Sequence, residues 1–288
     1  MIRPRKVFAQ HWLKSEKALD AIIQAADCTQ SDRSANAKGD RILEIGPGTG
    51  ILTRRLLPLA QSLVAVEIDR DLCELLAKQL GKTENFLLLQ GDFLTLDLPS
   101  HLLAFPNFQK PNKVVANIPY NITGPIIEKL LGTIANPNPE PFDSIVLLVQ
   151  KEVAERLYAK PGSKAFGALS VRVQYLAECE LICTVPAAAF HPPPKVDSAV
   201  VRLRPRKIEI PALNPRQLEN FLKLGFGAKR KMLRNNLQSV IERDRLTHLL
   251  EQLKINPQAR AEDISVQQWV ILANQLGVET RLIASVEE

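Results

Sequence analysis

Long apolar runs are absent from this sequence, and so is a secretion signal. No stretch approaches the roughly 18 consecutive apolar residues that a membrane-spanning helix requires. The basic N-terminus, residues 1–6, precedes an amphipathic segment and lacks the apolar stretch and cleavage site of a signal peptide. We therefore expect a soluble, cytoplasmic protein with no membrane partner.

Cysteine is scarce, and its spacing does not form a metal-binding pattern. Only two of the four cysteines lie close together, within an expected strand, and no second pair of Cys or His completes a site. We expect small core residues and no bound metal. The four cysteines are Cys28, Cys73, Cys179 and Cys183.

Net positive charge is confined to the C-terminal part of the chain. Thirteen Lys or Arg and five Asp or Glu lie between Lys195 and Arg245, so this stretch carries +8 and the rest of the chain −2. Such clustering favours a polyanionic partner, because contacts with phosphates release counterions and provide sequence-independent affinity. A solvated helical face would produce the same composition and remains the alternative.

The segment 41–149 predicts a doubly wound α/β domain. Short apolar runs bounded by turn residues alternate there with helical patterns, as in a mostly parallel sheet. Ligands of such sheets bind at the carboxyl ends of the strands. The expected strands are 41–45, 63–68, 86–90, 113–116 and 144–149, with helices at 51–59 and 71–80.

Beyond residue 150 the pattern becomes mixed and then helical. A helix is expected at 151–158, and alternating apolar residues at 169–177 predict a strand, as does the segment 199–203. Asn214 and Pro215 fit a helix N-cap and a first helical position. From there, helices are expected at 215–224, 230–241, 244–253 and 265–276.

We place a domain boundary near residue 207. The first domain is then 1–207, with an N-terminal segment and first helix at 1–40, and the second is a smaller all-α domain at 208–288. The basic stretch described above lies mostly in or next to the second domain, which favours a role in binding a polyanion.

The glycine-rich turn after the first strand predicts the cofactor. Gly46, Gly48 and Gly50 are spaced G-x-G-x-G, whereas dinucleotide sites use G-x-G-x-x-G, and an acidic residue, Glu44, precedes them. A carboxylate at this point would repel a pyrophosphate but suits the positive charges of S-adenosylmethionine. A nicotinamide-dependent oxidoreductase is therefore the weaker alternative.

Acidic residues also follow the next two strands. Glu67 lies 21 positions after Gly46, where a carboxylate can accept hydrogen bonds from both ribose hydroxyls. Asp92 follows the third strand and can accept from the adenine amino group. Each acid alone fits a solvated strand end or a helix cap. Together with the glycine turn, they predict a Rossmann-like fold of the class I methyltransferase type that binds S-adenosylmethionine.

The most specific motif is Asn-Ile-Pro-Tyr at residues 117–120, directly after the fourth strand. The amine of adenine or cytosine is a poor nucleophile, because its lone pair is delocalised into the ring. Asn117 and the main-chain carbonyl of Ile118 are neutral acceptors that can hold both amine hydrogens and direct the lone pair at a methyl carbon. Pro119 stiffens the turn, and Tyr120 can stack on the base. No general base is assigned, and a plain turn is the alternative.

A second stacking surface is needed for such a base, which reaches the site only when it is unpaired or flipped out. Phe190, on the proline-containing segment 190–195, is the candidate, although an aromatic residue before prolines is ordinarily a core or turn residue. The motifs together predict a methyltransferase whose target is the exocyclic amine of a nucleic-acid base.

Family motifs extend over nearly the whole chain, in the segments 5–13, 43–48, 66–71, 117–122, 150–153, 161–167, 190–201 and 230–236. Through them the sequence resembles the ribosomal RNA adenine dimethyltransferase family, most closely its bacterial small-subunit branch. The departures from the usual pattern keep size or polarity. They are Ala9 for glycine, Trp12 for phenylalanine, Ile118 for leucine, and His11 where asparagine is frequent.

The resemblance implies two sets of functional residues. The set around S-adenosylmethionine consists of His11, Leu13, Gly46, Glu67, Asp92 and Asn117. The set that holds the adenine consists of Asn117, Tyr120 and Phe190. Among the basic residues, we expect contacts with RNA from Lys195, Arg230, Lys231 and Arg234.

The resemblance also implies a substrate. It is a hairpin near the 3′ end of small-subunit rRNA, in which two adjacent adenosines receive four methyl groups, within a partly assembled 30S subunit. We expect a monomer. Two alternatives remain: an enzyme of the drug-resistance branch that acts on large-subunit rRNA, and a ribosome-assembly or RNA-binding factor with secondary catalysis. The loop 161–167 and the segment 230–236 favour the small-subunit branch.

Overall fold

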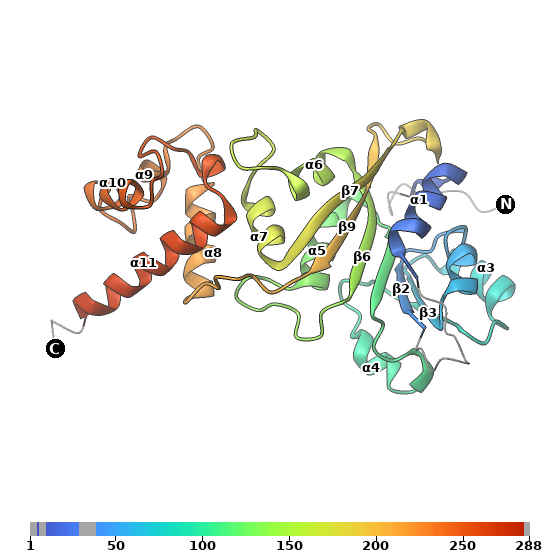
Figure 1. Cartoon of the computed structure of the whole chain (residues 1–288). Helices are drawn as coiled ribbons and strands as arrows, with labels where there is room; N and C mark the ends of the chain where they lie inside the picture. The colour runs from blue at the N-terminus through green and yellow to red at the C-terminus, as the bar shows by residue number, and fades with distance from the viewer. Residues whose placement is uncertain (1–4, 6–9, 29–38, 285–288) are drawn as a thin grey trace. The chain divides into compact units, whose positions relative to one another are not determined.

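The chain forms two compact units (Figure 1). The computed structural model describes residue 5, residues 10–28 and residues 39–284, with the side chains of the last helix only up to residue 276. The first unit comprises Met1–Leu130, Asn138–Ala154 and Glu178–Pro205, and the second comprises Leu131–Pro137, Glu155–Ala177 and Arg206–Glu288. Each unit has its own architecture and is described separately.

A seven-stranded sheet with the order β4-β3-β2-β5-β6-β9-β7 forms the centre of the first unit. The parallel strands match their expected positions within one residue, so the Rossmann-like doubly wound sheet is confirmed. β9 (Ser198–Pro205) runs antiparallel to β6, and β7 (Ala177–Val185) forms the edge. The parallel strands are β2 (Arg41–Ile45), β3 (Ser62–Glu67), β4 (Phe86–Gln90), β5 (Lys113–Asn117) and β6 (Ser144–Gln150).

The strand order reverses beside β2, and this reversal positions the ligand site. β3 and β4 lie on one side of β2, whereas β5 and β6 lie on the other. At such a switch point the connecting segments diverge and leave a crevice outside the carboxyl ends of the strands. The turn after β2 and the turn after β5 therefore face a common space.

Helices and turns surround this sheet. α1 begins at its N-cap Ser15, whose hydroxyl oxygen accepts a hydrogen bond from the Ala18 N–H at 3.3 Å, and α1 packs against β5, β6 and β9. The helix expected at 51–59 forms as a short α-helix followed by a 3₁₀ turn at Leu57–Leu59. The helices are α1 (Glu16–Ala26), α2 (Thr53–Leu56), α3 (Arg70–Leu80), α4 (Leu98–Leu102), α5 (Thr123–Leu131) and α6 (Lys151–Tyr158).

The first unit also contains a small two-stranded sheet, which the sequence did not predict. It pairs a segment near the start of the unit with a segment near its end. β1 (Trp12–Leu13) pairs antiparallel with β8 (Phe190–His191), so that Leu13 lies opposite Phe190. Two-residue strands have no readable alternation, which is why the pattern gave no signal for them. This pairing places the segment before α1 beside the segment before β9.

The strand expected at 169–177 is wrong, because these residues form α7 (Ala168–Leu176). The Ser170 hydroxyl oxygen accepts from the Gly167 N–H at 3.0 Å and the hydroxyl donates to the Arg156 carbonyl at 2.6 Å, which fixes the first turn. Val171 and Tyr175 share one face of the helix while Val173 points the other way, and all three are buried. Burial on two sides of the helix therefore imitates the alternation of a strand.

The helices of the second unit confirm the expected all-α C-terminal region, with one helix wrong in extent. The helix expected at 230–241 is only α9 (Leu233–Asn236), because Met232 instead forms a β-bridge with Arg260 and the Leu233 N–H donates to the Ala259 carbonyl at 2.9 Å. This tertiary pairing overrides helix propensity. Besides α7, the other helices of this unit are α8 (Pro215–Gly225), α10 (Arg243–Gln252) and α11 (Val266–Ala284).

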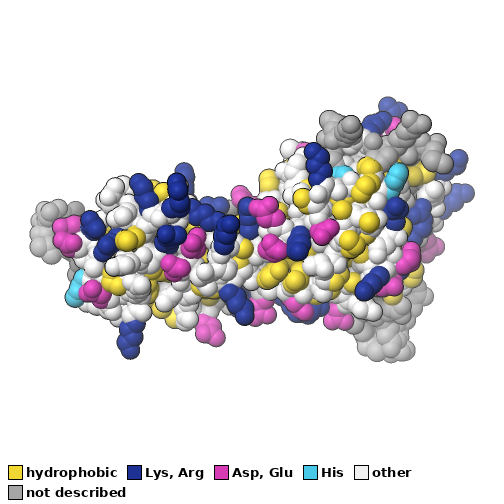
Figure 2. Space-filling model, turned by 90° about the horizontal axis from the view of Figure 1, so that it is seen from above, with side chains coloured by type: hydrophobic (Ala, Val, Ile, Leu, Met, Phe, Trp, Pro, Cys, Tyr) yellow, Lys and Arg dark blue, Asp and Glu magenta, His cyan; other side chains and the backbone are white. Residues whose placement is uncertain are grey.

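The surface of the second unit is rich in positive charge. On the face shown in Figure 2, Lys and Arg side chains gather along one edge of this unit. The exposed basic side chains of this unit include Lys229, Arg230 and Lys231, in the segment before α9.

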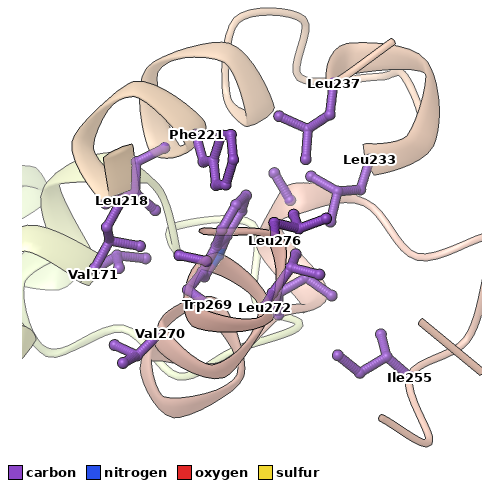
Figure 3. Close-up of a cluster of buried hydrophobic side chains, with 14 of the residues drawn as sticks. Val171, Leu218, Phe221, Leu233, Leu237, Ile255, Trp269, Val270, Leu272 and Leu276 are labelled. Carbon is purple, nitrogen blue, oxygen red and sulfur yellow. The ribbon is translucent and has the colours of Figure 1, made fainter. Parts of the chain in front are cut away.

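The core of the second unit is built around Trp269, which is 0% exposed. Figure 3 shows its indole among Phe221 of α8 and Leu272 and Leu276 of α11. Burying side chains of this size contributes roughly 1.5–3 kcal/mol each. The α8 and α11 helices therefore hold the unit together through their facing apolar sides.

Two features are absent from the residues that the structure describes. None of the helices found there combines the length and apolar character that crossing a membrane demands. Likewise, no group of three or more His, Cys, Asp or Glu side chains in the described ranges could hold a metal ion.

Candidate functional site

A cavity of about 270 Å³ opens in the first unit where the strand order reverses. Its walls come from the segment before α1 and from the ends of β2, β3, β4 and β5. The lining residues are Gln10, His11, Trp12, Ile45, Gly46, Gly48, Val66, Glu67, Ile68, Leu72, Gly91, Asp92, Phe93, Leu94, Asn117, Ile118, Pro119, Tyr120, Asn121 and Ile122. Seven of the sequence-predicted residues thus share one cavity with two of the predicted glycines.

The glycine turn after β2 forms one wall. Gly46 and Gly48 have φ values of 67° and 60°, in the left-handed region that side chains disfavour. A Cβ atom on Gly48 would also lie 3.4 Å from the Trp12 ring. The Gly46 N–H donates to the Val66 carbonyl at 2.9 Å, so the turn is held tightly against β3. The backbone is therefore bare on the side that faces a ligand.

Glu67, at the end of β3, is an oriented hydrogen-bond acceptor. Its Oε2 accepts from the Gly48 N–H at 3.0 Å, and its Oε1 accepts from the N–H groups of Ile68 and Asp69 at 2.9 and 3.0 Å. Burial raises the pKa of Glu67, and these three donors oppose that change. Each carboxylate oxygen has two acceptor positions. One position on Oε2 is left for a hydroxyl group of a ligand.

Glu44 does not line the cavity. Its side chain is 1% exposed, and burial raises its pKa to about 8, so the carboxyl group is neutral at pH 7. The nearby Glu67 adds to this rise, and the Thr53 hydroxyl opposes it. Strand alternation explains the placement, because Glu44 and Ile45 point to opposite faces of β2 and it is Ile45 that faces the cavity.

The buried Glu44 predicts a pH-dependent stability. Between its ordinary pKa of 4.5 and about 8, the unfolded chain releases a proton that the folded protein keeps, so the free energy of unfolding falls as pH rises. Glu44→Gln removes this pH dependence. The difference in the free energy of unfolding between variant and wild type is expected to change by about 1.4 kcal/mol per pH unit in this window. Urea unfolding at pH 5.5, 6.5 and 7.5 measures it. Parallel curves for the two proteins would contradict the buried neutral carboxyl.

Asp92 follows β4 and faces the cavity from a tight turn. Its Oδ1 accepts from the Leu94 N–H at 2.9 Å, and its main-chain carbonyl accepts from the Leu96 N–H at 2.8 Å. The second carboxylate oxygen, Oδ2, accepts nothing from the residues that the structure describes. Asp92 therefore offers an acceptor at the end of the cavity formed by β4.

The segment before α1 closes the cavity through His11. The His11 carbonyl accepts from Asn117 Nδ2 at 3.2 Å, and its Nδ1 lies 2.7 Å from the Pro192 carbonyl oxygen. The His11 ring stacks on the Tyr120 ring with centroids 5.8 Å apart and an interplanar angle of 19°. Leu13, by contrast, is buried and points away from the cavity.

The turn at residues 117–120 brings neutral acceptors to the cavity. Asn117 uses its Nδ2 on the His11 carbonyl, which turns its Oδ1 to a position where it accepts no hydrogen bond from any described residue. The Tyr120 hydroxyl lies 2.5 Å from Ser198 Oγ, so the ring is held from both its edge and its face. Burial raises the pKa of Tyr120, and the hydrogen bond with Ser198 opposes this. The phenol therefore stays neutral.

Several predicted residues lie outside this cavity. Phe190 is 1% exposed and packs in the core rather than against the cavity. Lys195 is exposed in the first unit, and Arg230 and Lys231 are exposed in the second. Arg234 is half-buried, and its Nε has no hydrogen-bond partner among the described residues.

The sequence did not single out some residues that the structure brings to the site. Gln10 donates from Nε2 to Asp69 Oδ2 at 3.0 Å and lines the cavity. Phe93 and Asn121 also line it, and Ser198 holds Tyr120 from outside. Phe93 and Asn121 are each adjacent to a predicted residue, so their position at a strand end was the available signal. Ser198 carried none, because its contact spans 78 residues.

The hydrogen-bond acceptors that line the cavity fit an adenosyl ligand with a positive charge. Two carboxylates, Glu67 and Asp92, line it, whereas neither Lys nor Arg does so among the described residues. Phosphate groups would be repelled, and hydroxyl and amino groups would be accepted. S-adenosylmethionine has hydroxyls, an amine and a sulfonium, and the bare glycine turn leaves room for its close approach.

Comparison with known sequences identifies a family and relatives of this chain. The family model described as "Ribosomal RNA adenine dimethylase" matches residues 1–277. "Ribosomal RNA small subunit methyltransferase A" of Nostoc punctiforme is 93% identical over 278 residues, covering 96% of each chain. The protein of the same name from Trichormus variabilis is 81% identical over 279 residues, covering 97% of this chain and 100% of the relative.

Two solved structures are also similar to this chain. A dimethyladenosine transferase from Plasmodium falciparum has a TM-score of 0.75 at 28% identity, covering 93% of this chain and 98% of its own. The 23S rRNA methyltransferase ErmE has a TM-score of 0.71 at 27% identity, covering 92% and 99%. Both likenesses extend over nearly the whole chain.

Proposed function

This chain belongs to the ribosomal RNA adenine dimethylase family, and we propose that it dimethylates two adjacent adenosines in a hairpin near the 3′ end of small-subunit rRNA. It is an rRNA adenine methyltransferase that uses S-adenosylmethionine. The observation that carries the proposed chemistry is that Asn117 lines the cavity together with Glu67 and Asp92, while its Oδ1 accepts no hydrogen bond from the described residues.

The turn at residues 117–120 would activate the amine without a charged base. S-adenosylmethionine supplies an electrophilic methyl group when it is bound. Asn117 Oδ1 and the Ile118 carbonyl would each accept one amine hydrogen, which aims the nitrogen lone pair at the methyl carbon. Pro119 keeps these acceptors in place, and the Tyr120 ring would stack on the adenine. Since none of these groups is a base, the proton leaves to water.

The cofactor would be held by groups from three strand ends and from the segment before α1. We assign the ribose hydroxyl to Glu67 Oε2 and the adenine amine to Asp92 Oδ2, because the described residues leave these acceptor positions free. Gly46 and Gly48 would lie against the methionine part, beside His11. Leu13 would contribute only through its main chain. Glu44 would act as a neutral support behind the glycine turn, since it is buried.

RNA binding is proposed for the helical region 208–288, assisted by Lys195. Lys229 Nζ donates to the Lys164 carbonyl at 3.1 Å, and this contact joins the loop 161–167 to the basic segment before α9. Both segments carry exposed basic side chains, so distant parts of the sequence contribute to one positive surface. Backbone phosphates are the partner that such a surface attracts.

Charge reversal tests this surface. Arg230→Glu combined with Lys231→Glu is expected to lower RNA affinity by about 10–100-fold at low salt and to reduce the salt slope by about 2, since two phosphate contacts are lost. Binding to a hairpin RNA is measured from 50 to 300 mM salt. Lys78→Glu, which changes an exposed residue of α3, is the control and should leave the slope unchanged. An unaltered slope in the double variant would exclude this surface from binding.

The choice of ribosomal subunit separates the main alternatives. The likeness to the 23S rRNA methyltransferase ErmE keeps large-subunit rRNA as the competing substrate. Purified protein and labelled S-adenosylmethionine are incubated with small and large subunits from unmethylated cells. We expect about four methyl groups per small subunit, as the resemblance implies for two dimethylated adenosines, and labelling of the large subunit alone would overturn the proposal.

The setting of the reaction belongs to the same proposal. We propose that the substrate is rRNA within a partly assembled 30S subunit, that the enzyme acts as a monomer, and that it works in the cytoplasm. Methylation of assembly intermediates compared with mature subunits tests the first of these. Equal rates on both would leave assembly without a role in recognition.

A further inference from the structure

We propose that Lys129 is a positioning residue for the cofactor's adenine, because it fixes the turn at residues 92–97 that presents Asp92 to the cavity. This inference rests on the proposed role of Asp92 as acceptor for the adenine amine. Lys129 lies on α5, outside the strand ends that line the cavity.

Lys129 makes three contacts with this turn. Its Nζ donates to the Leu94 carbonyl at 3.1 Å and to the Leu96 carbonyl at 2.8 Å. The same ammonium group lies 5.0 Å from the centroid of the Phe93 ring, within the range of a cation–π interaction. Hydrogen bonds from a charged donor are stronger than those between neutral groups. The ammonium group therefore holds the turn through three of its residues without lining the cavity itself.

Leu94 connects Lys129 to Asp92. The Leu94 N–H donates to Asp92 Oδ1 at 2.9 Å, while the Leu94 carbonyl accepts from Lys129. The Leu96 N–H donates back to the Asp92 carbonyl, and the Leu96 carbonyl again accepts from Lys129. Displacing these two residues would move two of the hydrogen bonds that orient Asp92. A change at Lys129 would reach the adenine site by this route.

The charges around Lys129 are consistent with a fixed ammonium group. Burial lowers the pKa of Lys129, and the carboxylates of Asp92 and Asp97 oppose this change. Both acids belong to the turn that the lysine holds, so its positive charge attracts two carboxylates of the same turn. Phe93 and Leu94 line the cavity themselves. The turn therefore supports Asp92 and also forms part of the cavity wall.

The test uses two ligands that differ only in the group that Asp92 would contact. Isothermal titration calorimetry measures how the full chain binds two ligands. One is S-adenosylhomocysteine, and the other is its deamino analogue, in which the purine ring lacks the 6-amino group. In Lys129→Met we expect the dissociation constant of S-adenosylhomocysteine to rise by about tenfold, while that of the deamino analogue changes by less than about twofold. Lys129→Arg should restore most of the affinity for S-adenosylhomocysteine, because a guanidinium can donate to both carbonyls.

Glu128→Met is the matched control, since it changes the neighbouring exposed residue of α5 and should leave both dissociation constants unchanged. Thermal melting of each variant shows whether the fold is kept. Equal weakening of both ligands in Lys129→Met, or no weakening of either, would overturn the role of Lys129. If the wild-type protein binds both ligands equally, then the assignment of Asp92 itself fails, and the inference fails with it.

Discussion

Asn117→Ala is expected to lower the rate of methyl transfer by about 10³-fold, the size seen when one preorganised hydrogen-bonding group is removed from a transition-state site. Asn117 lines the cavity and its Oδ1 accepts no hydrogen bond from the described residues, so the variant removes the proposed interaction with the amine. Affinity for S-adenosylhomocysteine should stay within about threefold, because the ligand's hydroxyl and amino groups are assigned to Glu67 and Asp92. Single-turnover methylation and calorimetry measure the two quantities.

The Asn117 side chain also donates to the His11 carbonyl, and this second role needs a control. Asn117→Asp keeps the size and an acceptor oxygen but lacks the Nδ2 donor, and Asn121→Ala changes a neighbouring residue of the same cavity. Asn121→Ala should methylate at nearly the wild-type rate. If Asn117→Ala loses cofactor affinity as strongly as it loses rate, then Asn117 acts mainly by holding the segment before α1, and the amine-activation proposal is wrong.

The same variant also separates an enzyme from a binding factor. In cells that lack the protein, Asn117→Ala should leave rRNA unmethylated, which mass spectrometry of the rRNA would show. Because Asn117 lies far along the chain from the basic surface around Arg230, RNA binding should persist. Full rescue of subunit assembly by the variant would favour the alternative in which binding, and not methylation, is the main activity.

The parallel sheet was predictable because its strands are buried on both faces. β6 reads Ser-Ile-Val-Leu-Leu-Val-Gln, and its residues 144–149 are all buried. Such runs are bounded by turn residues and stand out from helical patterns without any knowledge of their partners. The α7 helix was not predictable in this way, since packing on two sides gave it the alternation of a strand. Its identity depends on tertiary contacts.

The site was predictable in position and less so in orientation. Glu67, Asp92 and Asn117 follow strands, and parallel strands bring their carboxyl ends to one edge. A strand end does not reveal on which face a side chain lies, and Glu44 is the example: it sits beside the glycine turn but points into the core. The contacts of His11 with Asn117 and Tyr120 join residues more than 100 positions apart, and no local pattern encodes them.

Phe190 gives the largest expected effect on stability. Its ring is 1% exposed and packs with Leu13 across the β1–β8 pair and with the core behind it. Phe190→Ala is expected to lower the free energy of unfolding by about 3–5 kcal/mol, because it leaves a cavity in a close-packed core. Urea unfolding followed by circular dichroism measures this. A variant as stable as the wild type would mean that the ring is not a core residue in solution.

Phe190→Leu then decides whether the ring also stacks on the adenine. Leucine keeps an apolar side chain of similar size, so the cost in stability should be on the order of 1.5 kcal/mol and the fold should be kept. Stacking on a base contributes about 1–3 kcal/mol per base. If Phe190 holds the adenine, kcat/KM for RNA falls by about 10–100-fold in Phe190→Leu while S-adenosylhomocysteine binds normally. Because the ring is buried in the structure, that result would require the segment 190–195 to move when RNA binds. Unchanged methylation would instead mean that Phe190 is a core residue only. Tyr120 would then be the aromatic residue that contacts the base.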